Sequence, residues 1–538
     1  MTIARFPDLS HHQTDDNNPA IQLCGRRFYK DQTEIEYLVE FLLVFLSPKY
    51  VVDENEIGTG FPDSHTIDAW PINTPLRYVP QERLGLKLFA FLGSSKLETR
   101  HPCHKDRFEE LVTTLKQRIE TDYNTSKDQI LELLEQLLGG FVGVAANRTW
   151  CTQVFLPVGE GLIAGETIWK RVLGNKNPEI SWDQALEGIE TRKKNEKLFT
   201  FSNHDFMARG GEILYLQLCN LKRFLNSPEL AALEKQYDFE PGSGYRALQT
   251  IEQELENLFR KTSPITQIVQ WLEAADPETP RLVRDGRQDA KCGWCPEESW
   301  QEAYLFGQEF ANICRATIDP MEKIEMLTFC CVFQVLRSIC AQAVRYSMVM
   351  EDEQRMLGGC NGFAWLLTPA QLDDVAFKET AKQNLVRVRE VIYGAVKNPA
   401  ILSPETNTDK IKETEVDKHS QDLLVHLGKR IGFIAPRTGA GARFVMSEKV
   451  LRFLVLALVT PGETMTLASF TDRMFFHYGM AVSGSHLRKA ANWTYPRQEV
   501  QIAELQTNWL EDALLAAGFL IPLSDAVSQV KNPFGDKE

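Results

Sequence analysis

The sequence has few features of a secreted or membrane-bound protein. Its first residues lack a basic region followed by an apolar run and a cleavage site, so they do not resemble a secretory signal. The most apolar runs, 37–46 and 450–459, are each about ten residues long, well short of the roughly 20 that cross a bilayer. Eleven cysteines in 538 residues are too sparse for a disulfide framework. We therefore expect a cytoplasmic protein with reduced thiols and no membrane partner.

The motifs of common nucleotide-dependent and hydrolytic enzymes are also missing. No Gly-x-x-x-x-Gly-Lys-Ser/Thr loop occurs, and the glycine-rich stretch 438–443 lacks the lysine and hydroxyl that such a loop needs. Neither a Gly-x-Ser-x-Gly elbow nor a His-Glu-x-x-His helix is present. We expect no enzymatic activity. A divergent metal-dependent nuclease, with carboxylates spread along the chain, stays open as an alternative.

Helical periodicity dominates the sequence and predicts a mainly α, multi-domain protein. Hydrophobic residues make up 43% and charged residues 25% of the chain, as in folded globular proteins. At 538 residues the chain is too long for one core. The three-and-four spacing of apolar residues predicts helices in the following ranges: 33–47, 107–138, 211–226, 229–237, 246–260, 264–274, 298–317, 320–349 and 370–396.

The predicted helix 320–349 has the clearest signals. Asp319 is a good N-cap, and Pro320 suits the first helical position. Its apolar residues cover most of the helix circumference, which predicts burial in a helical core.

Composition divides the chain into four predicted parts. Residues 1–205 form a mixed, mostly helical domain, and short β-branched runs within 49–100 leave room for a small α/β part. Residues 206–400 form a helical core domain. The polar segment 401–420 lacks apolar periodicity and reads as a linker. Residues 421–538 form the C-terminal domain.

Charge is distributed unevenly along the chain. The net charge is −14, but residues 429–497 hold ten Lys and Arg against three Asp and Glu. A basic segment in an acidic protein is a candidate phosphate-binding surface. We therefore expect DNA as a partner of the C-terminal domain.

The C-terminal domain has the layout of a winged helix-turn-helix. Helices are predicted at about 447–459, 466–478 and 498–517, and the tail after Gly518 reads as two short strands with a turn. In such folds one helix enters the major groove while loops and the wing contact phosphates. The predicted nucleic-acid-binding residues are Arg437, Arg443, Arg488, Lys489 and Arg497.

Two stretches of this domain, LVTPGETMTLASFTDRMFFHYG and AAGFLIPLSDAVSQVKNPF, resemble the C-terminal winged-helix ends of large accessory proteins from bacterial anti-phage defence islands of the Druantia or Zorya kind. The resemblance covers about a fifth of the chain and includes no catalytic signature. It implies a DNA-binding or scaffolding subunit that works beside a helicase or nuclease. The residues themselves leave open a helical adaptor that binds only protein.

Zinc is the one cofactor that the residues suggest. Cys292 and Cys295 form a Cys-x-x-Cys pair, and Cys103 and His104 lie in a second compact cluster. Two such pairs would supply the four ligands of a closed tetrahedral site. The pairs lie far apart in sequence and match no familiar finger spacing, which favours unconnected loop residues over a zinc site.

Overall fold

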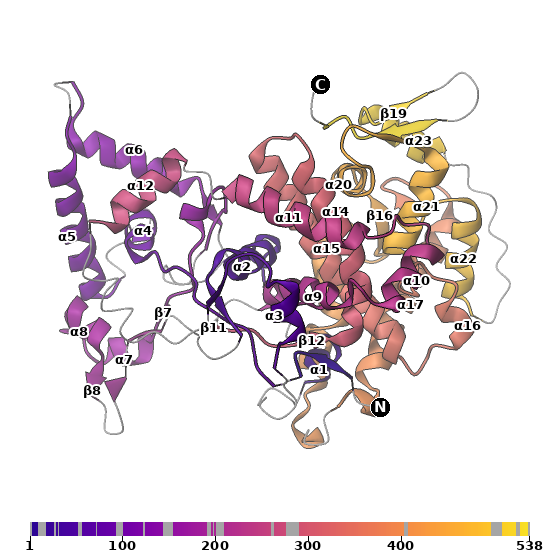
Figure 1. The fold of residues 1–538 in the computed structure, drawn as a ribbon, viewed down its shortest axis with the longest axis horizontal. Coiled ribbons are helices and arrows are strands. Elements are labelled where there is room, and N and C mark those ends of the chain that lie inside the picture. Colours follow the sequence, from indigo (N-terminus) through magenta and orange to yellow (C-terminus); the bar gives the residue numbers. More distant parts are fainter. Residues whose placement is uncertain are drawn as a thin grey trace.

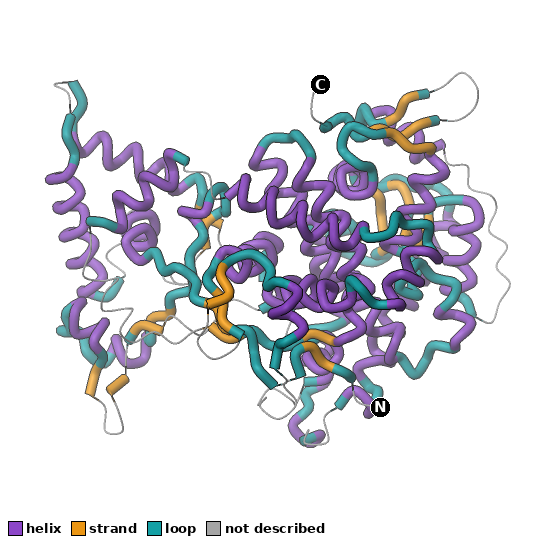
Figure 2. Tube along the Cα trace, in the orientation of Figure 1, coloured by secondary structure: helices purple, strands orange, loops and turns teal. Residues whose placement is uncertain are grey.

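The chain is mainly helical and forms a smaller lobe beside a larger body (Figure 1). Strands are only two to four residues long and lie scattered among the helices (Figure 2). Two hydrophobic cores correspond to the two parts. The computed structural model describes all residues except 1–2, 9–17, 26–27, 29, 31, 52–55, 72, 93–99, 122–123, 144–153, 191–194, 197, 201–208, 260–262, 276–289, 403–406, 497–507, 523–527 and 536–538.

The smaller lobe is built mostly from residues between 84 and 200. Its helices are α4 (Leu84–Lys87), the π-helical η1 (Leu88–Leu92), α5 (Pro102–Arg118), α6 (Lys127–Gly139), α7 (Arg171–Asn175), α8 (Trp182–Glu187) and α12 (Pro264–Glu273). Its paired strands are β5 (Val142–Gly143) with β6 (Val154–Phe155), β7 (Ile168–Trp169) with β10 (Phe199–Thr200), and β8 (Ile189–Glu190) with β9 (Asn195–Glu196). Helix α12 returns from the middle of the sequence to pack on α4, so the lobe is not one continuous segment.

Long helices form the centre of the larger body: α2 (Glu34–Leu46), α9 (Gly210–Phe224), α11 (Ser243–Phe259), α14 (Trp300–Arg315), α15 (Pro320–Tyr346), α17 (Val375–Val396) and α20 (Glu448–Leu458). Helix α14 packs against α9, α11, α15 and α20, and α15 packs against α2 and α17. Shorter helices surround them: α1 (Pro19–Cys24), α3 (Ser64–Asp68), α10 (Pro228–Gln236), α16 (Asp352–Arg355), α18 (Glu413–Lys418) and α19 (Gln421–Arg430).

The predicted central helix is confirmed as α15. The Asp319 carboxylate accepts a hydrogen bond from the Met321 backbone N–H at 2.8 Å, and Pro320 occupies the first turn. By length and hydropathy α15 could cross a membrane, but 94% of its most apolar window is buried inside the protein. The other helices predicted from 211 to 396 are also present, with ends shifted by a few residues.

The main core joins residues on both sides of the predicted linker. It includes Ile3 near one end of the chain and Val530 near the other. Within 401–420 the structure has α18, whose Val416 is 5% exposed, and His419 and Ser420 are buried as well. Two parallel strand pairs connect the middle and C-terminal regions: β13 (Trp365–Leu366) with β18 (Met480–Ala481), and β14 (Thr368–Pro369) with β16 (Arg443–Met446).

Short antiparallel strands complete the body. The region 49–100 contributes three strands to a four-stranded sheet, with the order β11 (Ala290–Lys291), β4 (Arg77–Tyr78), β2 (Lys49–Tyr50) and β3 (Glu56–Gly58). Near the N-terminus β1 (Arg5–Phe6) pairs with β12 (Cys295–Pro296), and β15 (Ile434–Ala435) pairs with β16. The C-terminal sheet has the order β17 (Thr464–Thr466), β20 (Gln529–Lys531) and β19 (Leu520–Ile521).

Among its described residues the C-terminal region has two helices more than the sequence predicts, α19 and one that follows α21. After α20 come α21 (Leu467–Tyr478), α22 (Gly484–Thr494) and α23 (Asn508–Ala516). The polar stretch from Ser483 to Lys489, which lies between the predicted helices 466–478 and 498–517, belongs largely to α22. The predicted third helix, 498–517, falls partly on residues outside the described chain and is otherwise seen as α23.

Close contact between α2 and α9 depends on glycine at position 211. An ideal Cβ on Gly211 would lie 2.3 Å from the Tyr37 carbonyl oxygen and 2.5 Å from the Glu40 Cβ. Gly211→Ala is therefore expected to lower the free energy of unfolding by about 1–3 kcal/mol, because backbone atoms cannot move aside cheaply. Urea titration measures the change. Gly139→Ala in α6 is the control: nothing lies within 4 Å of its ideal Cβ, so stability should stay the same or rise. Equal losses in both variants would contradict this account.

Candidate functional site

The structure places the five predicted nucleic-acid-binding residues in different environments. Arg437 is exposed in the connection between β15 and β16. Arg443 is only 6% exposed: its Nε donates to Thr368 Oγ1 at 3.1 Å and its Nη2 to a backbone carbonyl. It therefore holds β16 against β14 and is not available to a phosphate. Arg488 and Lys489 are exposed on α22, and Arg497 lies outside the described residues.

Several of the basic side chains in 429–497 form ion pairs or hydrogen bonds with other parts of the protein. Arg430 Nε lies 2.5 Å from Glu34, and Lys449 Nζ lies 2.6 Å from Glu325. Arg452 pairs with Glu322, and Arg473 donates to the Leu458 carbonyl at 2.8 Å. The acidic remainder of the chain supplies all three carboxylates. The basic segment therefore serves in large part to bind α2 and α15 of the same protein.

Arg437 borders a groove of about 810 Å³ between the beginnings of α15 and α20 and the end of α19. Apolar side chains line it together with three cations and four carboxylates, and the carboxylates are Glu34, Glu322, Glu325 and Glu448. Carboxylates repel a polyanion, so this groove suits nucleic acid poorly.

Helix α22 carries two further exposed cations of this segment, Arg488 and Lys489. Its inner face is fixed: Trp493 Nε1 donates to the Gly362 carbonyl at 3.2 Å, and Thr494 Oγ1 accepts from Asn384. The outward face presents four exposed polar side chains, Ser485, Arg488, Lys489 and Asn492, in which both cations lie three or four positions from Ser485 and from Asn492. Neither cation forms an ion pair with another described residue.

The N-terminus of α22 is also open. Ser483 stands at the N-cap but its side chain makes no capping hydrogen bond, and the first turn contains no acidic residue. Gly484 follows with φ +54°, and nothing lies within 4 Å of its ideal Cβ. Backbone N–H groups at such a helix end attract anions. Lys489 and Arg488 lie one turn further on, where they reinforce this attraction.

Histidine 486 joins α22 to α21. Its ring stacks on Phe475 with centroids 4.3 Å apart, and its Nε2 lies 2.6 Å from Asp472 Oδ1. The Asp472 carboxylate is thus engaged by the imidazole. Lys489 Nζ lies 5.7 Å from the same Phe475 ring.

The structure does not bring the two predicted zinc-ligand pairs together. Cys292 and Cys295 are buried in the main core, while Cys103 belongs to the core of the smaller lobe. His104 packs on aromatic rings of that lobe, and burial lowers its pKa to about 3. No group of three or more potential metal ligands occurs within the described part of the chain.

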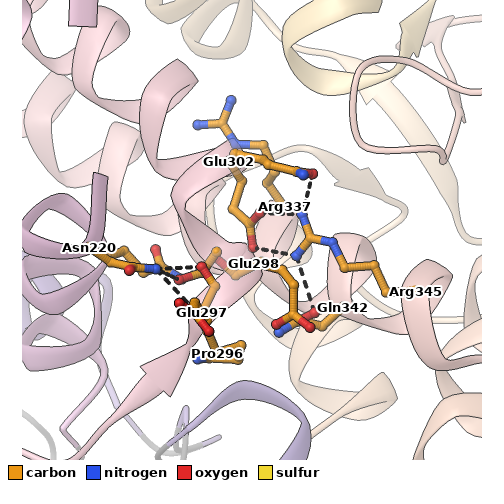
Figure 3. Close-up of polar contacts among 12 residues, drawn as sticks. Asn220, Pro296, Glu297, Glu298, Glu302, Arg337, Gln342 and Arg345 are labelled. Carbon is orange, nitrogen blue, oxygen red and sulfur yellow. Dashed lines mark hydrogen bonds and ion pairs between the residues drawn. The ribbon is translucent and has the colours of Figure 1, made fainter. Parts of the chain in front are cut away.

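Two ion pairs, one buried and one partly buried, connect α14 and α15, a feature that sequence reasoning missed. Arg345 lies 2.6 Å from Glu302 and also donates to Gln342, as Figure 3 shows. Two turns along, Arg337 forms a bidentate pair with Glu309, with both N···O distances at 2.8 Å. The seven-residue spacing on α14 matches the eight-residue spacing on the antiparallel α15. The only sequence signal was a charged residue inside an otherwise apolar helix.

The inner pair extends to α21 through His477. Its Nδ1 lies 2.7 Å from Glu309 Oε1, and the Arg337 guanidinium also donates to the His477 carbonyl. Burial opposes ionisation of Glu309, but Arg337 and His477 outweigh it and lower the carboxyl pKa. Burial lowers the pKa of His477, an effect that the Glu309 hydrogen bond only partly offsets. The histidine is therefore neutral at pH 7 and donates its Nδ1 proton to an ionised Glu309.

No protein-family model matches the chain, and comparisons with curated proteins and with solved structures found no match.

Proposed function

We propose that the protein is a non-catalytic, cytoplasmic subunit of a bacterial anti-phage defence or DNA-processing system, and that its C-terminal region binds duplex phosphates. One observation carries this proposal: α22 presents Arg488 and Lys489, without carboxylate partners, beside an uncapped helix N-terminus. Phosphate contacts of this kind supply most non-specific affinity for DNA. The resemblance to defence-island accessory proteins suggests a helicase or nuclease as the partner subunit.

The order of elements supports a winged helix-turn-helix as the binding fold. Helices α21 and α22 follow each other across a short connection, and the β19–β20 hairpin joins β17 in an antiparallel sheet. In a helix-turn-helix the second helix enters the major groove, with its N-terminal residues nearest the bases. We assign that role to α22. The hairpin is the wing of this arrangement.

The outward side chains of α22 have suitable chemistry for this role. Arginine and lysine can pair with guanine, and asparagine pairs with adenine. Arg488, Lys489 and Asn492 supply these groups on one face, while Ser485 lies nearest the open end. The opposite face is fixed in the core, which holds the reading face rigid.

A protein-binding adaptor is the second candidate. Several apolar side chains are exposed just after α15 and along α17: Met348 is 59% exposed, Val349 46%, Val386 45% and Tyr393 44%. Exposed apolar patches mark protein interfaces. Exposed apolar residues of this kind fit a scaffolding role alongside DNA binding. The nuclease alternative gains no support from the described residues, which contain no metal-ligand group.

The full-length protein is expected to bind a 20-base-pair duplex with little sequence preference, and to bind more weakly as salt rises. Each phosphate contact contributes about 0.9 to the slope of log affinity against log salt. Arg488→Ala combined with Lys489→Ala should therefore lower that slope by about two and weaken binding at least tenfold at low salt. Fluorescence anisotropy from 50 to 200 mM salt measures both.

The matched control removes two cations from the opposite end of the molecule. Lys116→Ala with Arg118→Ala changes α5 of the smaller lobe, far from α22 in Figure 1, and should leave the slope unchanged. If wild-type protein shows no salt-sensitive binding at low ionic strength, or if the two double variants behave alike, the DNA proposal fails. The adaptor is then the better account.

A further inference from the structure

A polar cleft of about 530 Å³ lies between α11, α14 and the α20–α21 segment. This volume is within the range of small-molecule sites. Three arginines line it from different elements: Arg246 on α11, Arg315 on α14 and Arg473 on α21. Three carboxylates, those of Asp238, Glu240 and Glu463, also line it. The described cleft is thus balanced in formal charge.

Two of the arginines keep donors for a ligand. Arg246 is paired with Glu240 at 2.9 Å. Among the described residues, Arg315 donates to Asn312 Oδ1 at 2.7 Å, and Arg473 donates to the Leu458 carbonyl at 2.8 Å. An arginine has five N–H donors in a planar fork that matches a phosphate or carboxylate. Arg315 and Arg473 therefore offer free N–H groups from two walls of one cleft.

His477 forms part of the same wall and is 4% exposed. Its Nδ1 side is occupied by Glu309 in the core. A neutral imidazole that donates from Nδ1 has an unprotonated Nε2, which accepts hydrogen bonds. Within the described residues Nε2 has no hydrogen-bond donor. A hydroxyl group of a ligand would satisfy it.

We propose that this cleft binds a sugar monophosphate unit, such as that of a mononucleotide. Arg315 and Arg473 hold the phosphate, while His477 Nε2 and the carboxylates of Asp238 and Glu463 accept from the sugar hydroxyls. The three carboxylates weigh against a polyphosphate, whose negative charge two arginines would not offset, and they suit the hydroxyl groups of a sugar. The site is separate from α22 and does not depend on DNA binding there.

Isothermal titration of the full-length protein with ribose 5-phosphate and with AMP tests the proposal. Both should bind at one site, and ribose or inorganic phosphate alone should bind at least tenfold more weakly. Arg315→Ala should weaken ribose 5-phosphate at least tenfold, because a charge-assisted hydrogen bond is lost. Arg473→Ala should do the same.

Arg315 is exposed, so its alanine variant should fold normally, and circular dichroism checks this. His477→Gln tests the hydroxyl contact: it should weaken ribose 5-phosphate while leaving inorganic phosphate binding unchanged. Arg118→Ala in the smaller lobe is the control and should bind like wild type. Absence of binding to wild-type protein, or wild-type affinity in a folded Arg315→Ala variant, would overturn the proposal.

Discussion

Replacing Arg337 with methionine is expected to lower the free energy of unfolding of the larger body by about 3–5 kcal/mol. The substitution leaves the Glu309 carboxylate buried at 0% exposure without its bidentate partner. A buried carboxylate without a partner either stays ionised and pays the cost of losing its hydration, or takes up a proton, and both lower the stability of the fold. Urea unfolding followed by tryptophan fluorescence measures the change.

Two further variants separate the charge effect from lost packing. Lys449→Met breaks the exposed pair with Glu325 and should cost no more than about 1 kcal/mol. Methionine at both 309 and 337 should recover part of the loss, since hydrophobic replacement of a whole buried pair is often neutral. A double variant as unstable as Arg337→Met would show that shape, not charge, sets the cost.

The pH dependence of this loss has a definite sign. The pKa of Glu309 is lowered in the folded protein, so its pairing stabilises the fold above the ordinary value of 4.5 and is lost as pH falls further. In Arg337→Met the buried carboxyl takes up a proton more readily. The stability difference between wild type and variant should therefore shrink between pH 7 and pH 4.

The isolated fragment 421–538 is expected not to fold cooperatively. Strands β16 and β18 pair with residues 365–369, which the fragment lacks. Phe453 of α20 stacks on Phe333 of α15 with centroids 4.9 Å apart, and Arg337 binds the His477 carbonyl. Removing 1–420 would expose this shared apolar surface to water, which costs about 25 cal/mol of free energy for each Å² exposed.

Circular dichroism during heating and two-dimensional NMR test the fragment. We expect a broad thermal change and poorly dispersed amide signals. Co-expression with residues 1–420 should restore a sharp transition in the complex, because the missing strand and helix partners return. A sharp transition and dispersed signals from the fragment alone would show that the C-terminal region is an independent domain.

Local signals were sufficient to predict the long helices but not α22. Helix α15 has its own cap, its own proline and apolar residues on all sides. Helix α22 begins with Gly484 and is polar along its outer face, so its sequence alone resembles a loop. It is helical because Leu487, Ala490 and Trp493 pack on α17 and β13. Tertiary packing outweighs weak propensity there.

Counting charges along the sequence located the basic segment but could not identify the partners of its side chains. The +7 of residues 429–497 correctly indicates a basic segment, but the partners of that charge lie far away in sequence, such as Glu34 for Arg430. A carboxylate almost 400 positions away cannot be assigned by spacing. The same applies to the pairs between α14 and α15, whose register is set by packing. Of the predicted phosphate-binding residues that the structure describes, Arg437, Arg488 and Lys489 are exposed, whereas Arg443 is buried.

The main core spans nearly the whole chain, and this has a consequence for synthesis. At 5–20 residues per second a ribosome needs roughly 6–24 s to make the last 118 residues. During that time the apolar face of α15 that later meets Phe453 stays uncovered. A nascent chain in this state is a target for chaperones and for aggregation. The yield of folded protein should therefore depend strongly on chaperone supply and on the temperature of expression, even if the finished protein is stable.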